Sequence, residues 1–224
     1  MSRGGPAPGT KPRPNYQLQL EEVLKAIPPD APKPRLLLHA CCAPCSSYVL
    51  EYLAARFDIT LFYYNPNIAP RAEYEKRVAE VRRLLRQMPA AAGVRFLPGP
   101  YDPARFTAMA RGLEDLPEGG ERCFRCYRLR LEQAARAARE GGFGYFCTTL
   151  SISPYKNAQK LNEIGQALAA QYAVAWLPSD FKKRGGYQRS IALSRAYGLY
   201  RQNYCGCAYS AAAAAHKGGH DEKG

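Results

Sequence analysis

Short apolar runs bounded by Pro, Gly or Asn alternate along this chain with longer segments in which apolar residues recur every three or four positions. The short runs are typical of buried strands and the longer segments of amphipathic helices. Strands are predicted at 36–40, 59–64, 94–97, 145–149 and 173–177, and helices at 17–27, 46–56, 73–87, 103–111, 126–140, 157–171 and 187–197. Strands that alternate with helices at this spacing predict a parallel, doubly wound α/β sheet.

The expected fold class is therefore an open, mostly parallel Rossmann-like (HUP-like) sheet with flanking helices. The pattern occupies residues 35–209, which predicts one domain. Residues 1–34 are rich in Pro and Gly, which predicts a disordered arm with one short helix near its end. Residues 210–224 begin with an alanine run and predict a flexible tail.

The chain carries 32 Lys and Arg residues against 19 acidic ones, a net charge of +13. Such a surplus indicates a polyanionic partner, of which nucleic acid is the commonest; the alternative is a solvated basic surface. There is no apolar run of membrane-spanning length and no secretory signal, so we expect no membrane partner and a cytoplasmic location. Eight cysteines in a reducing compartment indicate metal or redox chemistry rather than structural disulfides.

Seven of the eight cysteines fall in three tight groups, which are Cys41, Cys42 and Cys45; Cys123 and Cys126; and Cys205 and Cys207. The first group follows a predicted strand, where functional sites lie in open α/β sheets. The first two groups are expected to open helices, whose partial positive charge favours the thiolate. Cys147 stands alone in a predicted strand and is interpreted as a small core residue.

Two kinds of metal centre fit this pattern. A single zinc ion held by four thiolates would use only part of the set. Seven thiolates from three directions are better matched by a four-iron cluster with additional ligands. The sequence contains neither GxGxxG nor a Walker A motif, so a reductant in this chain would be the metal centre itself.

Several motifs together resemble the epoxyqueuosine reductase family of the QueH type. They are HACCAPC at 39–45, YNPNI at 64–68, ERCFRCY at 121–127, TLSISP at 149–154, FKK at 181–183 and YRQNYCGC at 200–207. The resemblance spans about residues 36–207. It implies a cobalamin-independent reductase that converts epoxyqueuosine to queuosine at the wobble base of tRNA with a GUN anticodon, using electrons from an external one-electron donor.

The resemblance also implies a [4Fe-4S] cluster, whose ligands by motif position are Cys41, Cys42, Cys123 and Cys126. Cys205 and Cys207, with Cys45 beside them, would form a neighbouring catalytic site for a second metal such as iron. Cys45 either ligates that metal, forms a redox disulfide pair or is only a neighbour. Loss of the epoxide oxygen as water needs a proton donor, and the candidates are Asp180, Asp102, Tyr64 and Tyr204. The alternative for Asp180 is a helix cap.

A loop that interleaves charges, glycines and rings is the predicted tRNA contact, through Lys182, Lys183, Arg184, Tyr187 and Arg189. Its alternative is a mobile basic surface loop. The helix face that carries Arg71, Lys76, Arg77, Arg82, Arg83 and Arg86 either extends the phosphate footprint or is a solvated face.

Two other functions are consistent with parts of the sequence. A tRNA thiolation enzyme on a related scaffold would need a Gly-rich loop after the first strand to bind ATP, and residues 39–47 contain no glycine. A zinc-stabilised RNA-binding module without catalysis would share the cysteines and the basic charge.

Overall fold

The computed structural model describes residues 14–218, so the first thirteen residues of the predicted disordered arm lie outside the described part. The strands are β1 (Arg35–His39), β2 (Asp58–Tyr63), β3 (Arg95–Pro98), β4 (Tyr145–Thr148) and β5 (Ala175–Trp176). The α-helices are α1 (Tyr16–Ala26), α2 (Ala43–Leu53), α3 (Arg71–Gln87), α4 (Pro103–Ala110), α5 (Glu121–Glu140), α6 (Ala158–Tyr172), α7 (Gly186–Ala196) and α8 (Ala208–Gly218). Two short 3-10 helices, η1 (Pro89–Ala91) and η2 (Thr149–Ile152), complete the set.

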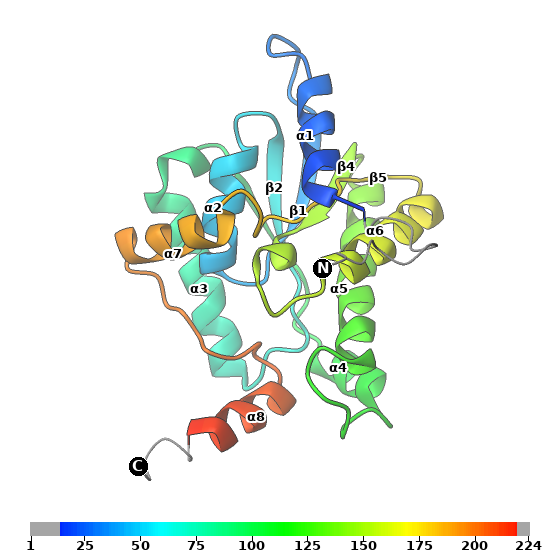
Figure 1. Ribbon diagram of the computed structural model, residues 1–224, viewed down its shortest axis with the longest axis vertical. Helices are drawn as coiled ribbons and strands as arrows, with labels where there is room; N and C mark the ends of the chain where they lie inside the picture. The colour runs from blue at the N-terminus through cyan, green and yellow to red at the C-terminus, as the bar shows by residue number, and fades with distance from the viewer. Residues whose placement is uncertain (1–13, 219–224) are drawn as a thin grey trace, which may run out of the picture.

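The five strands form one open sheet in the order β3-β2-β1-β4-β5, and every neighbouring pair is parallel. This confirms the predicted fold class. Because all strands run the same way, their carboxyl ends lie along one edge of the sheet. The order in which strands are added reverses between β1 and β4, which lie side by side, and a doubly wound sheet opens a crevice at such a point (Figure 1).

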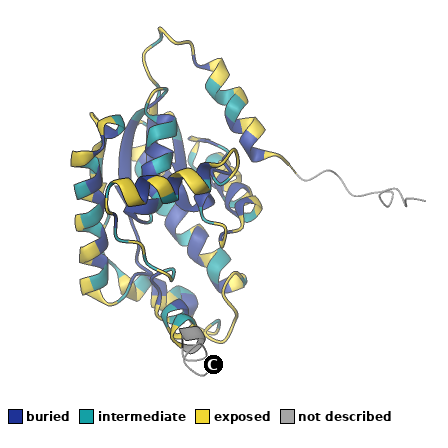
Figure 2. Ribbon diagram, turned by 60° about the vertical axis from the view of Figure 1, so that its left-hand side comes forward, coloured by how far each residue is buried: buried dark blue, intermediate teal, exposed yellow. Residues whose placement is uncertain are grey.

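Helices cover both faces of the sheet, with α2, α3 and α7 on one side and α5 and α6 on the other (Figure 1). Alternation along β1 explains the two layers, because successive side chains of a strand point to opposite faces. Leu36 and Leu38 pack in the core beneath α2 and α3, whereas Leu37 packs beneath α5 and α6. All three are fully buried, as Figure 2 shows for the central strands as a whole.

A buried histidine joins the carboxyl ends of three strands. His39 ends β1; its Nε2–H donates to the carbonyl of Tyr64, next to β2, and its Nδ1 accepts from the hydroxyl of Thr148 in β4. Burial lowers the pKa of His39 to about 3, so the ring is neutral and serves as a fixed strut. The first cysteine group follows this strut directly.

Two helix starts differ from the sequence prediction. Helix α2 begins at Ala43 rather than at residue 46, because extended Cys42 is its N-cap and Pro44 is favourable in a first turn. Helix α5 begins at Glu121 rather than at residue 126, directly after Gly119 and the N-cap Gly120. Both corrections strengthen the expectation that the first two cysteine groups open helices, since Cys45 and Cys123 now lie in first turns.

A helix occupies the first part of the segment for which the sequence predicted a flexible tail from residue 210. Residues 208–218 form helix α8, and Ser210 within it accepts a hydrogen bond from the backbone of Cys205 at 2.9 Å. The alanine run is therefore helical, as alanine's high helix propensity favours, and its start is tied to the third cysteine group. Residues 219–224 lie outside the described part.

No helix within residues 14–218 has the length and apolarity needed to cross a membrane.

Asn162 on α6 should be the main polar link between that helix and the sheet. Its buried amide accepts from Trp176 Nε1 and from the backbone N–H of Ser179, and donates to the carbonyls of Ala158 and Ser179. Asn162→Ala leaves Trp176 Nε1–H and the backbone N–H of Ser179 without an acceptor. We therefore expect the free energy of unfolding, measured by urea denaturation, to fall by about 2–4 kcal/mol. The exposed Gln166→Ala on the same helix is the control, and an equally small loss in both variants would contradict this role.

Candidate active site

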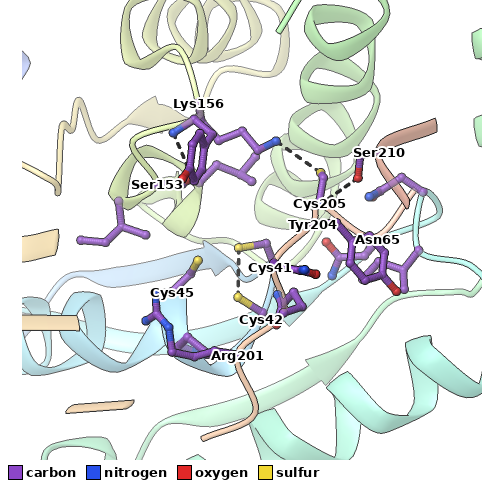
Figure 3. Close-up of a pocket in the computed structure, with 18 of the residues that line it drawn as sticks. Cys41, Cys42, Cys45, Asn65, Ser153, Lys156, Arg201, Tyr204, Cys205 and Ser210 are labelled. Carbon is purple, nitrogen blue, oxygen red and sulfur yellow. Dashed lines mark hydrogen bonds between the residues drawn. The ribbon is translucent and has the colours of Figure 1, made fainter. Parts of the chain in front are cut away.

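A cavity of about 610 Å³ opens at the carboxyl edge of the sheet. Its wall contains Cys41, Cys42 and Cys45 after β1, Asn65 and Asn67 after β2, and residues 150 and 152–156 after β4. Residues 201–205 and helix α8 close the other side. Figure 3 shows these side chains converging from elements far apart in sequence. The cavity lies where sites in open α/β sheets are expected.

The first cysteine group is compact. The sulfur atoms of Cys41, Cys42 and Cys45 all lie within 4.8 Å of one another, and Cys41 Sγ is 3.8 Å from Cys42 Sγ. Hydrogen bonds from the Cys42 and Cys45 thiols, with the positive charge of Arg130, lower the pKa of Cys41 well below its ordinary value. The Cys42 pKa is correspondingly raised to about 12. The group therefore favours a thiolate at Cys41 over one at Cys42, and it could bind a metal.

The other two cysteine groups meet at a second, smaller cavity lined by Cys123, Cys126, Cys205 and Cys207. Backbone N–H groups point at two of these sulfurs, from Gly119 to Cys123 at 3.3 Å and from Ser210 to Cys207 at 3.4 Å. Gly206, with φ of 110°, lets the chain turn between the last two cysteines. All three sequence groups thus come to the same edge of the sheet.

Four residues line both cavities: Asn67, Arg130, Lys156 and Cys205. They mark the place where the two cysteine sets adjoin. The structure groups Cys45 with Cys41 and Cys42, whereas the sequence placed it beside Cys205 and Cys207. The physical reason is that Cys45 lies one helical turn after Cys42 at the start of α2, which brings their sulfurs to one side.

Arg130 is the unusual member of this junction. Its side chain is only 2% exposed, and among the described residues it forms no ion pair with a carboxylate. One nitrogen, Nη2, donates to Asn65 Oδ1, while Nε has no hydrogen-bond partner within residues 14–218. A guanidinium stays charged even when buried. The sulfurs of Cys126, Cys41 and Cys205 interact favourably with this charge when they are thiolates, and the pKa values of Cys41 and Cys205 are lowered.

Lys156 is a second buried cation that the sequence did not single out. Its Nζ is 3.3 Å from Cys205 Sγ and 3.5 Å from Glu118 Oε1. The neighbouring Cys207 thiol and the Lys156 ammonium together lower the pKa of Cys205 to about 5. Arg130 could have been inferred from sequence, because it follows Cys126 by four residues on one helix face. Lys156 could not, since 49 residues separate it from Cys205.

The predicted basic face of α3 is only partly exposed. Arg77 is 2% exposed, in contrast to the expected outward position. Its Nε donates to Glu73 at 2.6 Å and its Nη1 to the carbonyl of Cys205 at 3.1 Å. Arg77 therefore anchors the third cysteine group to α3. Arg71, Lys76 and Arg82 lie over the rings of Tyr101, Tyr200 and Phe96.

The candidate proton donors are separated by the fold. Tyr204 lines the large cavity. Asp180 pairs with Lys182 outside the lining of both cavities, and Asp102 caps helix α4 through the backbone N–H of Arg105. The Tyr64 hydroxyl is buried and has no partner within the described residues.

The predicted tRNA loop is largely tied down. Lys182 pairs with Asp180, Arg184 with Glu21 and Arg189 with Glu51. Lys183 is exposed, and Tyr187 lines the large cavity. Of the five predicted contacts, Tyr187 is thus the one that the structure brings to the cavity, while three cations have carboxylate partners.

Cys147 lies apart from the other cysteines, fully buried in β4 with its Sγ near the carbonyl of Leu177. Burial raises its pKa to about 12, so it stays a thiol at neutral pH. The interpretation of this residue as core is consistent with its position.

Lys156→Met should raise the pKa of the Cys205 thiol, because the ammonium that stabilises the thiolate is lost. In the metal-free, reduced protein, Cys205 should react with iodoacetamide at about pH 6, above its folded pKa of about 5; in the variant the rate profile should move to higher pH. The interaction between Cys205 and Lys156 contributes fully to the free energy of unfolding at a pH above 9.0, the ordinary pKa of a cysteine thiol. That contribution is lost as the pH falls toward 5, because the thiolate is then protonated. Peptide mass spectrometry measures the rates, Lys160→Met on α6 is the control, and an unshifted profile would refute the coupling.

Known proteins resemble this chain over nearly all of its described part. The family model described as "Epoxyqueuosine reductase QueH" matches residues 36–213. A relative of that name from Streptococcus pyogenes serotype M1 is 43% identical, covering 88% of this chain and 78% of its own length. The Staphylococcus epidermidis relative is 42% identical, covering 88% and 84%, and the one from Thermotoga maritima is 38% identical, covering 78% and 89%. The chain belongs to the epoxyqueuosine reductase QueH family.

Proposed function

We propose that this chain reduces epoxyqueuosine to queuosine in tRNA, in the cytoplasm. The overall change opens the epoxide, forms a carbon–carbon double bond and releases the oxygen as water, consuming two electrons and two protons. The observation that carries the proposal is the convergence of seven cysteines around two adjoining cavities, one of them about 610 Å³ in volume. A cavity of that size accepts one nucleoside-sized group.

The residues fit a metal–sulfur cofactor. Soft thiolates select iron–sulfur clusters, zinc or copper(I), and no carboxylate or imidazole belongs to the compact first group. A thiolate-bound cluster is anionic, and Nε of Arg130 and Nη2 of Arg77, which have no hydrogen-bond partner within residues 14–218, are buried donors beside the cysteines. Such N–H groups are the usual neighbours of cluster sulfur.

We assign Cys41, Cys42, Cys123 and Cys126 to a [4Fe-4S] cluster, which supplies the electrons when bound. Cys205 and Cys207 are assigned to an adjacent catalytic site for a second iron. Cys45, which lies against Cys41 and Cys42, either ligates the second metal, forms a redox pair or is only a neighbour.

The chain's own residues then have separate tasks. The large cavity encloses the modified ring and limits its contact with water. Tyr204 and Lys156 are two of the residues on its wall that carry a proton. Asn65 holds Arg130 and also donates to the carbonyl of Ala40, so it fixes the cation relative to the end of β1.

The substrate is tRNA with a GUN anticodon. An external one-electron donor supplies electrons to the cysteine site. The net charge of +13 favours a polyanion, and affinity for tRNA should fall as salt rises.

Anaerobically purified protein should contain iron and acid-labile sulfide. With a strong one-electron donor it should convert epoxyqueuosine tRNA to a product that mass spectrometry shows to lack one oxygen. Cys126→Ala removes a buried sulfur of the site and should abolish both the cluster signal and conversion. Cys147→Ala removes an equally buried sulfur from β4 and should cost only stability, about 1 kcal/mol.

The same preparation identifies the competing outcomes. Stoichiometric zinc without sulfide would favour a zinc-stabilised RNA-binding module. No conversion by an iron-replete sample would reject the reductase.

Arg130→Met should make the reduction potential of the bound cluster more negative, because a buried cation stabilises the electron-rich reduced state. Arg130→Lys keeps the charge and should stay closer to the native potential. The measurement is a dye-mediated redox titration followed by electron paramagnetic resonance. Arg128→Met, which removes a cation from the exposed face of the same helix, is the control. If Arg130→Met has the same reduction potential as the native protein, the charge of Arg130 does not influence the cluster.

A further inference from the structure

The size of the large cavity restricts which part of an RNA can enter it. Its volume of about 610 Å³ suits one nucleotide and its modification, not a stretch of loop. A nucleotide within a tRNA loop stays bonded to its neighbours on both sides. When one base is inside the cavity, the adjoining bases must therefore lie at the mouth.

The cavity wall includes side chains suited to single-stranded RNA. Tyr155, Tyr187 and Tyr204 bring aromatic rings, and Arg201 brings a cation. Figure 3 shows Arg201 across the cavity from Lys156. Aromatic faces that stack on splayed bases, together with cations for the backbone, form the usual surface for single-stranded nucleic acid.

Tyr155 differs from the other two rings in its exposure. It is 78% exposed, whereas Tyr187 and Tyr204 are half-buried. The other large hydrophobic side chains exposed on the described surface are covered more fully, with Leu18 next at 46%. Packing within the fold therefore gives no reason for an aromatic residue at this position.

The backbone that presents Tyr155 is fixed. Its N–H donates to Ser153 Oγ at 3.3 Å, and the N–H of Lys156 donates to the Ser153 carbonyl at 3.2 Å. Pro154 restricts the turn, and the Lys156 side chain is anchored to Cys205 and Glu118. The ring is thus exposed on a rigid turn, which lowers the conformational entropy lost on binding.

We propose that Tyr155 is a stacking platform for a nucleobase adjacent to the modified nucleotide in the anticodon loop of the RNA substrate. The inference rests on the proposed function, because it takes the cavity as the place where the modified base binds. A flat, π-faced base is the ligand that an exposed ring at the mouth accepts without hydrogen-bond readout. Arg201, which lines the same cavity, is placed to meet a phosphate of the same strand.

The test measures the affinity of a fluorescently labelled anticodon stem-loop for full-length variants. Tyr155→Ala should weaken binding on the order of tenfold, within the range that loss of one base–aromatic stack produces. Tyr155→Phe and Tyr155→Trp keep the aromatic face and should bind like the native protein. Leu18→Ala, an exposed residue on α1, should leave affinity unchanged.

The salt dependence separates stacking from charge. Tyr155→Ala should keep the native slope of affinity against salt, whereas Arg201→Met should flatten it, since only the arginine displaces counterions. Native affinity in Tyr155→Ala would overturn the proposal. So would an equal loss in Tyr155→Ala and Tyr155→Phe, which would assign the effect to the hydroxyl rather than to the ring.

Binding of the stem-loop is measured without turnover, so the result is independent of the conversion assay. A native protein that binds through Tyr155 but does not remove the epoxide oxygen would reject the proposed reductase and retain the platform. If the native protein converts epoxyqueuosine tRNA but Tyr155→Ala binds the stem-loop with native affinity, the reductase function is retained and the stacking platform is rejected.

Discussion

The site depends on the electrostatic interaction between two buried positive charges and the cysteine sulfurs beside them. Arg130 and Lys156 lie where the two cavities adjoin, and among the described residues Arg130 has no carboxylate partner. Burying an unpaired charge is costly, so a fold retains one only where something nearby compensates it. Here cysteine sulfurs face both cations, Lys156 also faces Glu118, and the two positive charges favour the thiolate forms of Cys41 and Cys205. Assembly of the site and its chemistry thus have one electrostatic origin.

The parallel sheet makes that balance possible. His39 ties the ends of β1 and β4 to the segment after β2, so the loops that carry Cys41, Asn65 and Lys156 start from fixed points. Arg77 and Ser210 then hold the backbone of Cys205 from the opposite side. A rigid frame lets flexible loop positions supply the chemistry, which is the general arrangement in open α/β sheets.

The division of the cavities also suggests how a reductase can act on a large substrate. The small cavity is lined by cysteines and buried rings, whereas the wall of the large one includes the exposed side chains of Tyr155 and Arg201. The proposed cluster ligands Cys41 and Cys42 line the large cavity together with the proposed RNA-contacting groups, so the two kinds of group adjoin directly. A single domain can then bind an RNA loop at its surface and protect the reacting ring inside.

The sequence by itself determined the fold class and the cysteine content of the site, because strand and helix periodicity and clustered thiols are local properties of the chain. It also identified the family through motifs that are contiguous in sequence. Only the tertiary structure decided that Cys45 lies with Cys41 and Cys42, that Arg77 is buried, and that α8 closes the cavity. These facts depend on contacts between residues far apart in sequence, such as Lys156 and Cys205, and such contacts leave no periodic or compositional signal.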